Sequence, residues 1–272
     1  MKKGFCLFLV CLLCLTALTG CGSVIRYQYE DAGHYTAGNG DAAVDEVTEI
    51  EIDWTVGSVT VELYEGEKIQ FSDNSSFPKD ENLLHSYLDG TTLKIRFRES
   101  TSFRLGNMEP KDLEVLVPAT AADCIRELSV AAQSAEVFIR GLQMEMLEVE
   151  TVSGGITVDA EAENITVDTV SGPVALSGTF GDVKIDTVSG DASVLGVRCP
   201  EKLEGNSTSG NFRVTLPLLS DFACTFHTVS GSFDGSDFSE RRVAEETVYT
   251  VGNGENKLEF ETVSGDLYLT KQ

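Results

Sequence analysis

A four-residue phrase, Thr-Val-Ser-Gly, recurs along the second half of this chain and constrains its fold more than any other feature. Its copies begin at Thr151, Thr169, Thr187, Thr228 and Thr262, and a degenerate copy begins at Ser207. The spacings are 18, 18, 20, 21 and 34 residues, so one unit spans 18 to 21 residues and the last interval carries an insertion. Periods in this range are typical of solenoids, whose units bury their apolar faces only against neighbouring units.

Within each unit the apolar residues alternate with polar ones at a period of two. Leu147 and Val149 alternate with Glu148 and Glu150, and the same pattern resumes after Gly154. Alternation of this kind in runs rich in Val, Ile and Thr indicates half-buried strands. The sequence therefore predicts an all-β fold, a parallel β-solenoid (β-helix) with an irregular β-rich N-terminal part. We expect its coils to be right-handed, the usual hand of parallel crossovers.

Stacked coils predict a ladder of equivalent threonines and glycines at the bends. The threonine hydroxyls are expected to face inward and to bond along the stack or to bend amides. The glycines are expected where the bend needs a positive φ or a close approach of two backbones. The predicted structural repeat positions are Thr151, Gly154, Thr169, Gly172, Thr187, Gly190, Thr228, Gly231, Thr262 and Gly265.

The residue before each copy of the phrase is expected to face solvent, and most of these residues are acidic. The predicted column comprises Glu150, Asp168, Asp186, Asn206, His227 and Glu261. In register, its carboxylates would lie roughly 4.8 Å apart and repel one another. A cation or a basic ligand would relieve that repulsion, so Glu150, Asp168, Asp186 and Glu261 form a candidate ligand or cation face. The alternative is a solvated acidic face that serves solubility.

The first half of the chain is also expected to be β-rich, and the whole chain divides into four segments. Residues 1–20 are predicted to be a lipoprotein signal peptide, and residues 21–46 a lipidated cysteine with a flexible tether rich in Gly, Ala and Asp. Residues 47–118 form the N-terminal β-rich segment. Residues 119–272 form the solenoid, which either stands alone or continues directly from residues 47–118.

The N-terminus indicates secretion and lipid anchoring. Lys2 and Lys3 precede an apolar run, residues 5–18, that is too short for a comfortable membrane span of roughly 20 residues. The following Leu-Thr-Gly-Cys, residues 18–21, resembles the bacterial lipobox, in which the cysteine is diacylglyceryl-modified. This resemblance implies that Cys21 anchors the protein on the extracytoplasmic face of a bacterial cell membrane, where two acyl chains give stable attachment. An ordinary secretory peptide with a chance cysteine is the alternative.

The charge balance limits the partners of this protein. The chain has 20 Lys and Arg against 44 Asp and Glu, a net charge of −24, and loss of residues 1–20 would make it 18 − 44 = −26. Nucleic-acid binding needs basic residues that neutralise phosphates, so we expect no nucleic-acid partner. Basic partners are favoured instead.

The sequence offers no convincing catalytic, metal or cofactor site. Its histidines, His34, His85 and His227, are far apart in the sequence. Beyond the signal segment and Cys21, Cys124, Cys199 and Cys224 form an odd set without a Cys-x-x-Cys pair, which argues against zinc. They are expected to be buried free thiols, or one disulfide with a spare thiol. We therefore expect no enzyme, no metal and no cofactor.

Several motifs together resemble the DUF4097 family of bacterial envelope proteins, whose members are described as candidate adhesins. They are Tyr35-Thr36-Ala37-Gly38, the Ile-x-Ile-x-Trp strand at residues 50–54 with its Val-Gly-Ser-Val-Thr-Val continuation, the Leu-Asp-Gly-Thr-Thr-Leu turn at residues 88–93, and the tandem Thr-Val-Ser-Gly units. The resemblance covers residues 35–272 and departs in the insertion at residues 232–261. It implies a β-helix-like extracellular domain, often membrane-tethered, and supplies no catalytic residues.

Three functional hypotheses follow. The first is a non-catalytic, adhesin-like envelope lipoprotein that presents an acidic β-solenoid to a cell-wall polymer, a peptide or a surface protein. The second is an envelope-stress accessory that binds cationic peptides or cations on its acidic face. The third is a polysaccharide-active enzyme on a β-helix, which would need two close carboxylates in a cleft and a raised pKa.

Overall fold

The protein consists of strands joined by turns and short 3-10 helices. The computed structural model describes residues 24–74, 80–104, 109–238, 242–243 and 248–272. Within these ranges no helix is long and apolar enough to cross a membrane. The predicted signal peptide and Cys21 lie outside the described residues.

The N-terminal part contains short strands and one long one. Its strands are β1 (Val24–Tyr27), β2 (Thr36–Ala37), β3 (Gly40–Ala43), β4 (Glu49–Tyr64), β5 (Lys68–Asp73), β6 (His85–Asp89), β7 (Thr92–Arg96), β8 (Thr101–Arg104) and β9 (Lys111–Pro118). The 3-10 helices are η1 (Ala32–His34), η2 (Val44–Glu46), η3 (Asp80–Asn82) and η5 (Ala119–Ala121). β6 and β7 form an antiparallel hairpin, and Gly90 in the Leu-Asp-Gly-Thr-Thr-Leu turn of residues 88–93 has a φ of 64°.

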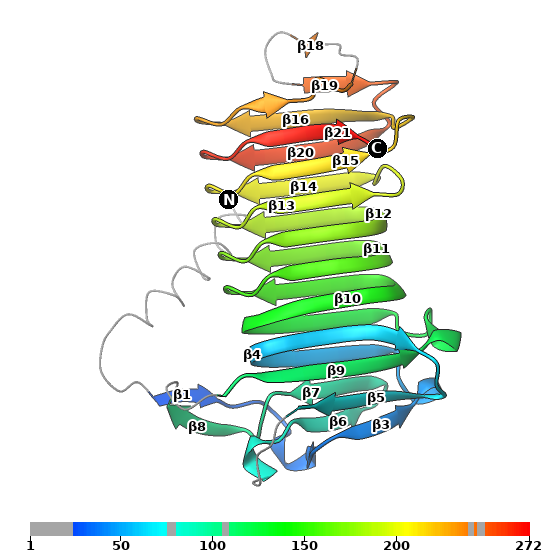
Figure 1. Ribbon diagram of the computed structural model, residues 1–272, viewed down its shortest axis with the longest axis vertical. Helices are drawn as coiled ribbons and strands as arrows, with labels where there is room; N and C mark the ends of the chain where they lie inside the picture. The colour runs from blue at the N-terminus through cyan, green and yellow to red at the C-terminus, as the bar shows by residue number, and fades with distance from the viewer. Residues whose placement is uncertain (1–23, 75–79, 105–108, 239–241, 244–247) are drawn as a thin grey trace.

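The rest of the chain winds into coils. Its strands are β10 (Glu127–Thr151), β11 (Ile156–Thr169), β12 (Val174–Thr187), β13 (Ala192–Gly196), β14 (Lys202–Ser207), β15 (Phe212–Leu216), β16 (Phe222–Thr228), β17 (Phe233–Asp234), β18 (Arg242–Val243), β19 (Val248–Val251), β20 (Asn256–Thr262) and β21 (Leu267–Lys271). Figure 1 shows them stacked as rungs along the long axis of the molecule.

The rungs pair in parallel, and equivalent residues stack in register. Thr151 pairs with Thr169, and Thr169 pairs with Thr187. Inward positions alternate with outward ones, as the period of two predicts, and the inward Val, Ile and Leu side chains form the core. One inward column runs through Val158, Leu176, Val194, Val214 and Leu269. The predicted all-β, mainly parallel architecture is confirmed.

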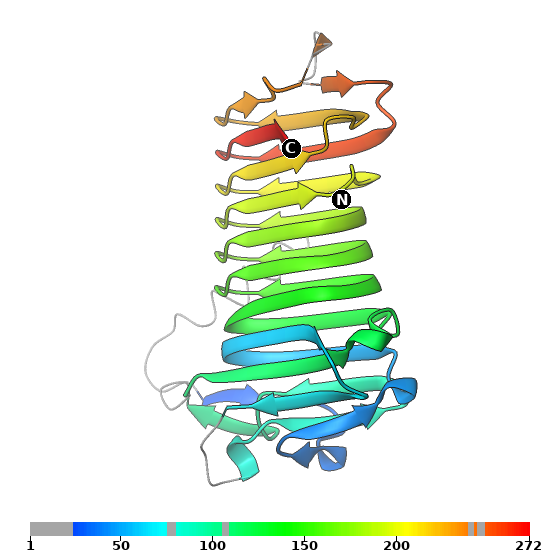
Figure 2. The ribbon, with the colours of Figure 1, turned by 45° about the vertical axis from the view of Figure 1, so that its right-hand side comes forward.

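The N-terminal part and the solenoid share one sheet. β4 pairs in parallel with β10 from Glu49 opposite Glu127 to Glu62 opposite Arg140. On its other side β4 pairs in parallel with β7 and β9. Below them β3 and β5 add antiparallel pairs and close this end of the stack, as Figures 1 and 2 show.

Residues 24–46 differ from the predicted flexible tether. β1 pairs with β8, β2 with β6, and β3 with β5. Tyr27 is buried, and its hydroxyl donates a hydrogen bond of 3.0 Å to the carbonyl of Asp53. Backbone pairing and aromatic burial therefore fix this segment to the body, and the Gly- and Asp-rich composition was a misleading guide.

The last coil does not follow the sequence order. β20 pairs with β14 on one side and with β16 on the other, and β21 lies between β15 and β17. The coil that contains Thr262 therefore lies below the coil that contains Thr228. The hairpin of β19 and β18 covers the top rung through antiparallel pairing with β16.

Candidate functional site

Each Thr-Val-Ser-Gly phrase forms a tight turn held by its own threonine. The Thr169 hydroxyl accepts a hydrogen bond of 3.1 Å from the Gly172 N–H, three residues ahead. Equivalent bonds from the glycine N–H to the side-chain oxygen join Gly190 to Thr187, Gly210 to Ser207, Gly231 to Thr228 and Gly265 to Thr262. At the first copy the Thr151 hydroxyl bonds to the Gly154 carbonyl and lies 3.0 Å from the Thr169 hydroxyl. The predicted bonding to the bends is therefore observed, and Thr228 alone of the five threonines is half-buried.

The glycines of the phrase provide close approach between rungs. A Cβ at Gly172 would lie 1.9 Å from the carbonyl oxygen of Gly154, and one at Gly190 would lie 2.1 Å from that of Gly172. The column continues through Gly210, Gly265 and Gly231 in that spatial order. None of these glycines has a positive φ, so close backbone approach is the reason for glycine here.

The predicted acidic column exists as an in-register row on the outer face of the sheet. Glu150 pairs with Asp168, and Asp168 pairs with Asp186. The row continues from Asp186 through Asn206 to Glu261 and ends at His227. Glu150, Glu261 and His227 are exposed, while Asp168 and Asp186 are half-buried. We call Glu150, Asp168, Asp186 and Glu261 the acidic column.

The middle of the acidic column is electrostatically strained. Burial raises the pKa of Asp168, Lys184 opposes that shift, and the carboxylates of Asp186 and Glu150 raise the pKa further. Asp186 pairs with Lys184 and accepts a hydrogen bond of 2.7 Å from the side-chain amide of Asn206. Lys184 thus partly neutralises two neighbouring carboxylates, those of Asp168 and Asp186. The face retains a negative charge that a basic group could neutralise.

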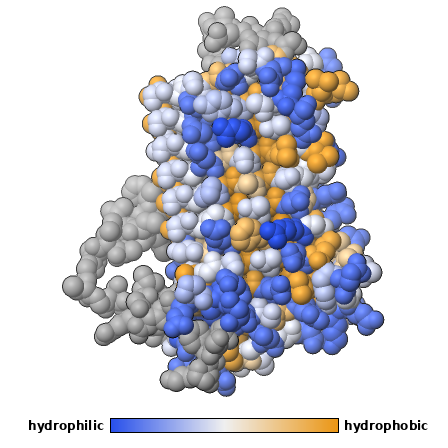
Figure 3. All heavy atoms as spheres, in the orientation of Figure 1, coloured by the Kyte–Doolittle hydropathy of each residue, from blue (hydrophilic) through white to orange (hydrophobic). Residues whose placement is uncertain are grey.

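Two lysines beside the acidic column were not anticipated from the sequence. Lys184 stands two residues before Asp186, and Lys202 forms a 2.6 Å ion pair with Glu204. The sequence contains a signal for both lysines, because each stands two residues before an acid and residues two apart on a strand share a face. Exposed valines form a further row at the turns, including Val152, Val263 and Val229 at 43%, 50% and 83% exposure. Figure 3 shows pale and orange groups alternating along the left-hand edge, where the turns stack.

The histidines and cysteines do not converge on a reactive site. His85 is buried and its Nδ1 lies 3.1 Å from the Leu83 carbonyl, whereas His34 packs on the Tyr87 ring at 5.2 Å. Cys124, Cys199 and Cys224 are free; Cys224 is buried, but Cys124 is exposed, contrary to the expectation of buried thiols. In the part of the chain that the structure describes, no group of three His, Cys, Asp or Glu could hold a metal ion.

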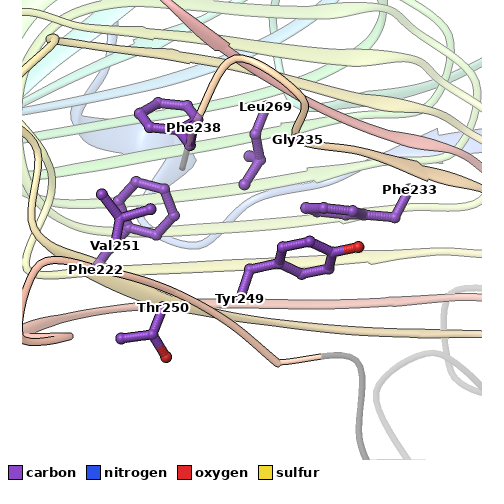
Figure 4. Close-up of a pocket in the computed structure, with 8 residues that line it drawn as sticks. All are labelled: Phe222, Phe233, Gly235, Phe238, Tyr249, Thr250, Val251 and Leu269. Carbon is purple, nitrogen blue, oxygen red and sulfur yellow. The ribbon is translucent and has the colours of Figure 1, made fainter. Parts of the chain in front are cut away.

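A small apolar hollow lies at the end of the stack that β16 and the β18–β19 hairpin form, and none of the acidic column residues lines it. Figure 4 shows its lining, which consists of Phe222, Phe233, Gly235, Phe238, Tyr249, Thr250, Val251 and Leu269. The rings of Phe233 and Tyr249 stack with centroids 3.9 Å apart. All eight of these described lining residues are uncharged, and six of them are aromatic or aliphatic.

A protein-family model matches most of the chain. The family model described as Toastrack DUF4097 matches residues 47–199 and, a second time, residues 125–270. The overlap of the two matches agrees with the repetition of the coils. No curated protein matches the sequence.

One solved structure shares the fold at low sequence identity, and two others align with lower scores. A candidate adhesin from Bacteroides fragilis NCTC 9343 aligns with a TM-score of 0.51 and 16% identity over 85% of this chain and 95% of its own. A candidate cell adhesion protein from Clostridium sporogenes ATCC 15579 gives 0.33 and 11% over 88% and 100%. A candidate lipid-binding protein from Parabacteroides distasonis ATCC 8503 gives 0.40 and 14% over 87% and 97%. The likeness to the Bacteroides structure concerns the fold alone.

Proposed function

Because this chain belongs to the toastrack DUF4097 family, we propose that it is a non-catalytic, adhesin-like interaction module of the bacterial cell envelope. The module presents the outer face of its solenoid to a cell-wall polymer, a peptide or a surface protein. The description of the Bacteroides fragilis neighbour as a candidate adhesin supports this class of function. A rigid stack with repeated surface positions suits docking of an extended partner.

The observation that carries the proposal is the acidic column. Its carboxylates keep one register over successive rungs, so a partner meets the same group at a regular interval. The raised pKa of Asp168 reflects burial and the neighbouring carboxylates of Asp186 and Glu150. A basic partner that neutralises these groups would remove repulsion that is present in the free protein.

A matched pair of charge variants tests the role of the acidic column. The column-neutral variant combines Glu150→Gln, Asp168→Asn and Asp186→Asn. The control variant combines Glu136→Gln, Asp159→Asn and Glu161→Gln, which are exposed acids outside the column and remove the same net charge. We expect loss of partner binding in the column-neutral variant alone. Equal loss in both variants would show that only net charge matters.

A second candidate function is the capture of cationic peptides or cations on the same face. Its support is Lys184, whose ammonium already pairs with Asp186 in the acidic column. A fluorescent decalysine peptide is the probe, and its affinity should collapse as salt rises, because screening shortens the Debye length from about 10 Å at 0.1 M to about 3 Å at 1 M. Decalysine binding that is unchanged in the column-neutral variant would refute this second function.

Membrane attachment through diacylglyceryl-Cys21 completes the proposal and places the module on the extracytoplasmic face. Its support is the lipobox resemblance of residues 18–21 together with the apolar run before it. Cys21→Ser should release the protein from the membrane fraction into the medium, whereas Cys124→Ser should leave it attached. Persistence of Cys21→Ser in the membrane fraction would contradict lipid anchoring.

A further inference from the structure

The C-terminal coil lies inside the stack rather than at its end. In Figure 1 the C-terminus is marked among the rungs, below β16 and the β18–β19 hairpin. β20 is inserted between β14 and β16, and β21 is inserted between β15 and β17. The coil Asn256–Lys271 therefore fills a slot whose two walls are built by earlier parts of the same chain.

The path of the chain passes this slot once before filling it with residues 256–271. After Leu216 the segment 217–221 passes one rung and enters β16. The chain then forms the β18–β19 hairpin and returns at residues 252–255 to fill the rung that was passed. The inserted coil joins the earlier strands through residues 252–255, so opening of that turn would release the coil from the slot.

The slot is specific for this coil on both sides. Six residues of β20 pair with β14, from Lys257 opposite Lys202 to Thr262 opposite Ser207. The same strand pairs with β16 along its whole length. The coil's apolar side chains Leu258, Phe260, Leu267 and Leu269 are buried in the core. An empty slot would expose the edges of four strands, β14, β15, β16 and β17, and the core surface that these side chains cover. Such a slot is a strong acceptor for strands of matching sequence.

Residues 252–255 form a short turn that connects β19 to the inserted coil, and we expect this turn to act as the hinge. Gly252 and Gly254 have φ values of 67° and 75°. The turn is held by the Asp221 carboxylate, which accepts bonds of 2.9 Å and 2.8 Å from the N–H groups of Asn253 and Glu255. Asp221 belongs to segment 217–221, which passes the rung that β20 fills. Segments 217–221 and 252–255 therefore meet at one edge of the molecule.

An exposed apolar patch lies on that same edge. Leu218 and Leu219 are 64% and 92% exposed on the segment before Asp221, and Val197 is 65% exposed on the equivalent connection one rung below. Gln272 joins the strand ends that precede the two connections, because its side chain donates to the Gly196 carbonyl and its N–H to the Leu216 carbonyl. Figure 3 shows orange groups on the upper right-hand edge, at the height of these connections. Apolar surface beside a hinge is suited to contact with a second chain.

We propose that the slot between β14–β15 and β16–β17 also accepts the C-terminal coil of a second copy of this chain, so that two chains form a dimer by exchanging β20 and β21. The exchanged coil makes the contacts that it makes within one chain, so the slot favours a second copy over any other occupant. Opening of the turn at residues 252–255 links the two bodies, and Leu218 and Leu219 of the two chains meet where the bodies approach. The proposal is independent of the acidic column and of its partners.

A disulfide trap distinguishes exchange from other modes of association. Glu204 and Glu259 are paired neighbours on β14 and β20, and paired residues of parallel strands lie roughly 4.8 Å apart, within the range for a disulfide. The test protein carries Glu204→Cys and Glu259→Cys in a background with Cys124→Ser and Cys199→Ser. The control protein carries Glu148→Cys and Thr166→Cys, a pair on β10 and β11 that exchange does not separate.

Both proteins, starting at Gly22, are refolded at high concentration, separated by size, oxidised and run on a denaturing non-reducing gel. We expect a dimer peak in which the test pair links two chains and the control pair links only residues of one chain. The monomer peak should show the test pair linked within one chain, which verifies the fold of the variant. Absence of a dimer peak, or a dimer in which the test pair links within one chain, would overturn the proposal.

Surface variants test the contribution of the apolar patch. Leu218→Ser together with Leu219→Ser should give a several-fold loss of dimer at equal protein concentration, with no change in the melting temperature of the monomer. Val229→Ser is the matched control, because Val229 is 83% exposed at a different edge, and it should leave the dimer fraction unchanged. Equal loss in both variants would contradict the placement of the contact beside the hinge.

Discussion

The repeated coils and the N-terminal end of this protein place their buried polar groups in different ways. Among the described residues from β10 onward, the buried polar side chains are Thr151, Thr169, Thr187, Thr262 and Ser220, all uncharged. At the N-terminal end the buried set includes two charged residues, Arg96 and Lys111. The coils repeat one small hydrogen-bonded unit, whereas the end depends on individual ionic contacts.

Lys111 shows what such an individual contact involves. Its ammonium lies 3.0 Å from Asp73, 4.3 Å from the centre of the Phe97 ring and 4.9 Å from that of Trp54. Burial lowers the pKa of Lys111 to about 8, while the Asp73 carboxylate opposes that shift. Buried charges are stable only with well-placed partners, so this end tolerates less change than any single coil.

A solenoid needs unique residues at the end of the stack, where a rung lacks a second neighbouring coil. A coil within the stack forms its interstrand hydrogen bonds and its apolar core with equivalent coils above and below it. A terminal rung has a neighbouring coil on one side only. At the N-terminal end, β3 and β5 cover the other side through antiparallel pairing of β3 with β5 and of β5 with β9.

The largest effect is expected at the N-terminal end. Lys111→Met removes the ammonium that faces Asp73 and that also bonds to the carbonyls of Asn82 and Phe97. Breaking a buried ion pair costs about 3–5 kcal/mol. Urea unfolding at pH 7 measures the loss, and the double variant with Asp73→Asn should recover part of it. Lys111→Met with unchanged stability would remove the distinction between the two regions.

The next effect concerns the close approach of coils. Gly172→Ala places a Cβ 1.9 Å from the Gly154 carbonyl oxygen, so the two rungs must separate. Overpacking of this kind costs about 3 kcal/mol. Gly155→Ala is the control, because its Cβ would meet nothing nearer than Pro173 Cγ at 3.5 Å. Thermal unfolding should show a lower midpoint for Gly172→Ala alone, and equal midpoints would refute the role of close approach.

A smaller loss is expected from removal of one ladder hydroxyl. Thr169→Val keeps the shape but removes the oxygen that accepts the Gly172 N–H at 3.1 Å. A buried donor without its acceptor costs about 1–2 kcal/mol. Thr157→Val, at an exposed position on the same strand, should change the free energy of unfolding by less than about 0.5 kcal/mol. A loss that is equal in both variants would indicate a general effect of valine.

The smallest effect is expected at the acidic column and has a distinct pH dependence. The raised pKa of Asp168 means that the folded state binds a proton more tightly than the unfolded chain does, so ionised Asp168 is destabilising. Asp168→Asn should therefore stabilise the protein at pH 7 by about 0.5 kcal/mol. The gain should vanish as the pH falls through the raised pKa towards the ordinary value of 3.8.

Denaturant titrations at neutral and acid pH measure this dependence. Asp159→Asn, an exposed acid outside the acidic column, serves as the control and should show no comparable gain. A gain for Asp168→Asn that persists below the ordinary pKa would show that relief of charge is not its cause.

The sequence predicted the regular part of the fold because the repeat and the alternation are local patterns. Thr151, Thr169 and Thr187 stack as expected, and with them Glu150, Asp168 and Asp186. The spatial order of the last two copies could not be predicted, because Thr228 and Thr262 stand in the same phrase. Their order depends on a strand pairing that only the assembled stack determines.

The N-terminal end was harder to predict because its contacts are distant in sequence. Asp73 and Lys111 are 38 residues apart, and no periodic pattern connects them. The ordered segment after Val24 did leave a signal, since Tyr27 and Tyr29 alternate with Arg26 and Gln28 as in a strand. The Gly- and Asp-rich residues that follow outweighed that signal.

We propose that the repeats align the acidic column as a docking face. The most direct test measures binding of the unmodified protein, the column-neutral variant and the control variant to isolated bacterial envelopes over a range of salt concentrations. We expect salt-sensitive binding of the unmodified protein and the control variant, and loss of binding in the column-neutral variant. Equal binding of all three proteins would contradict it.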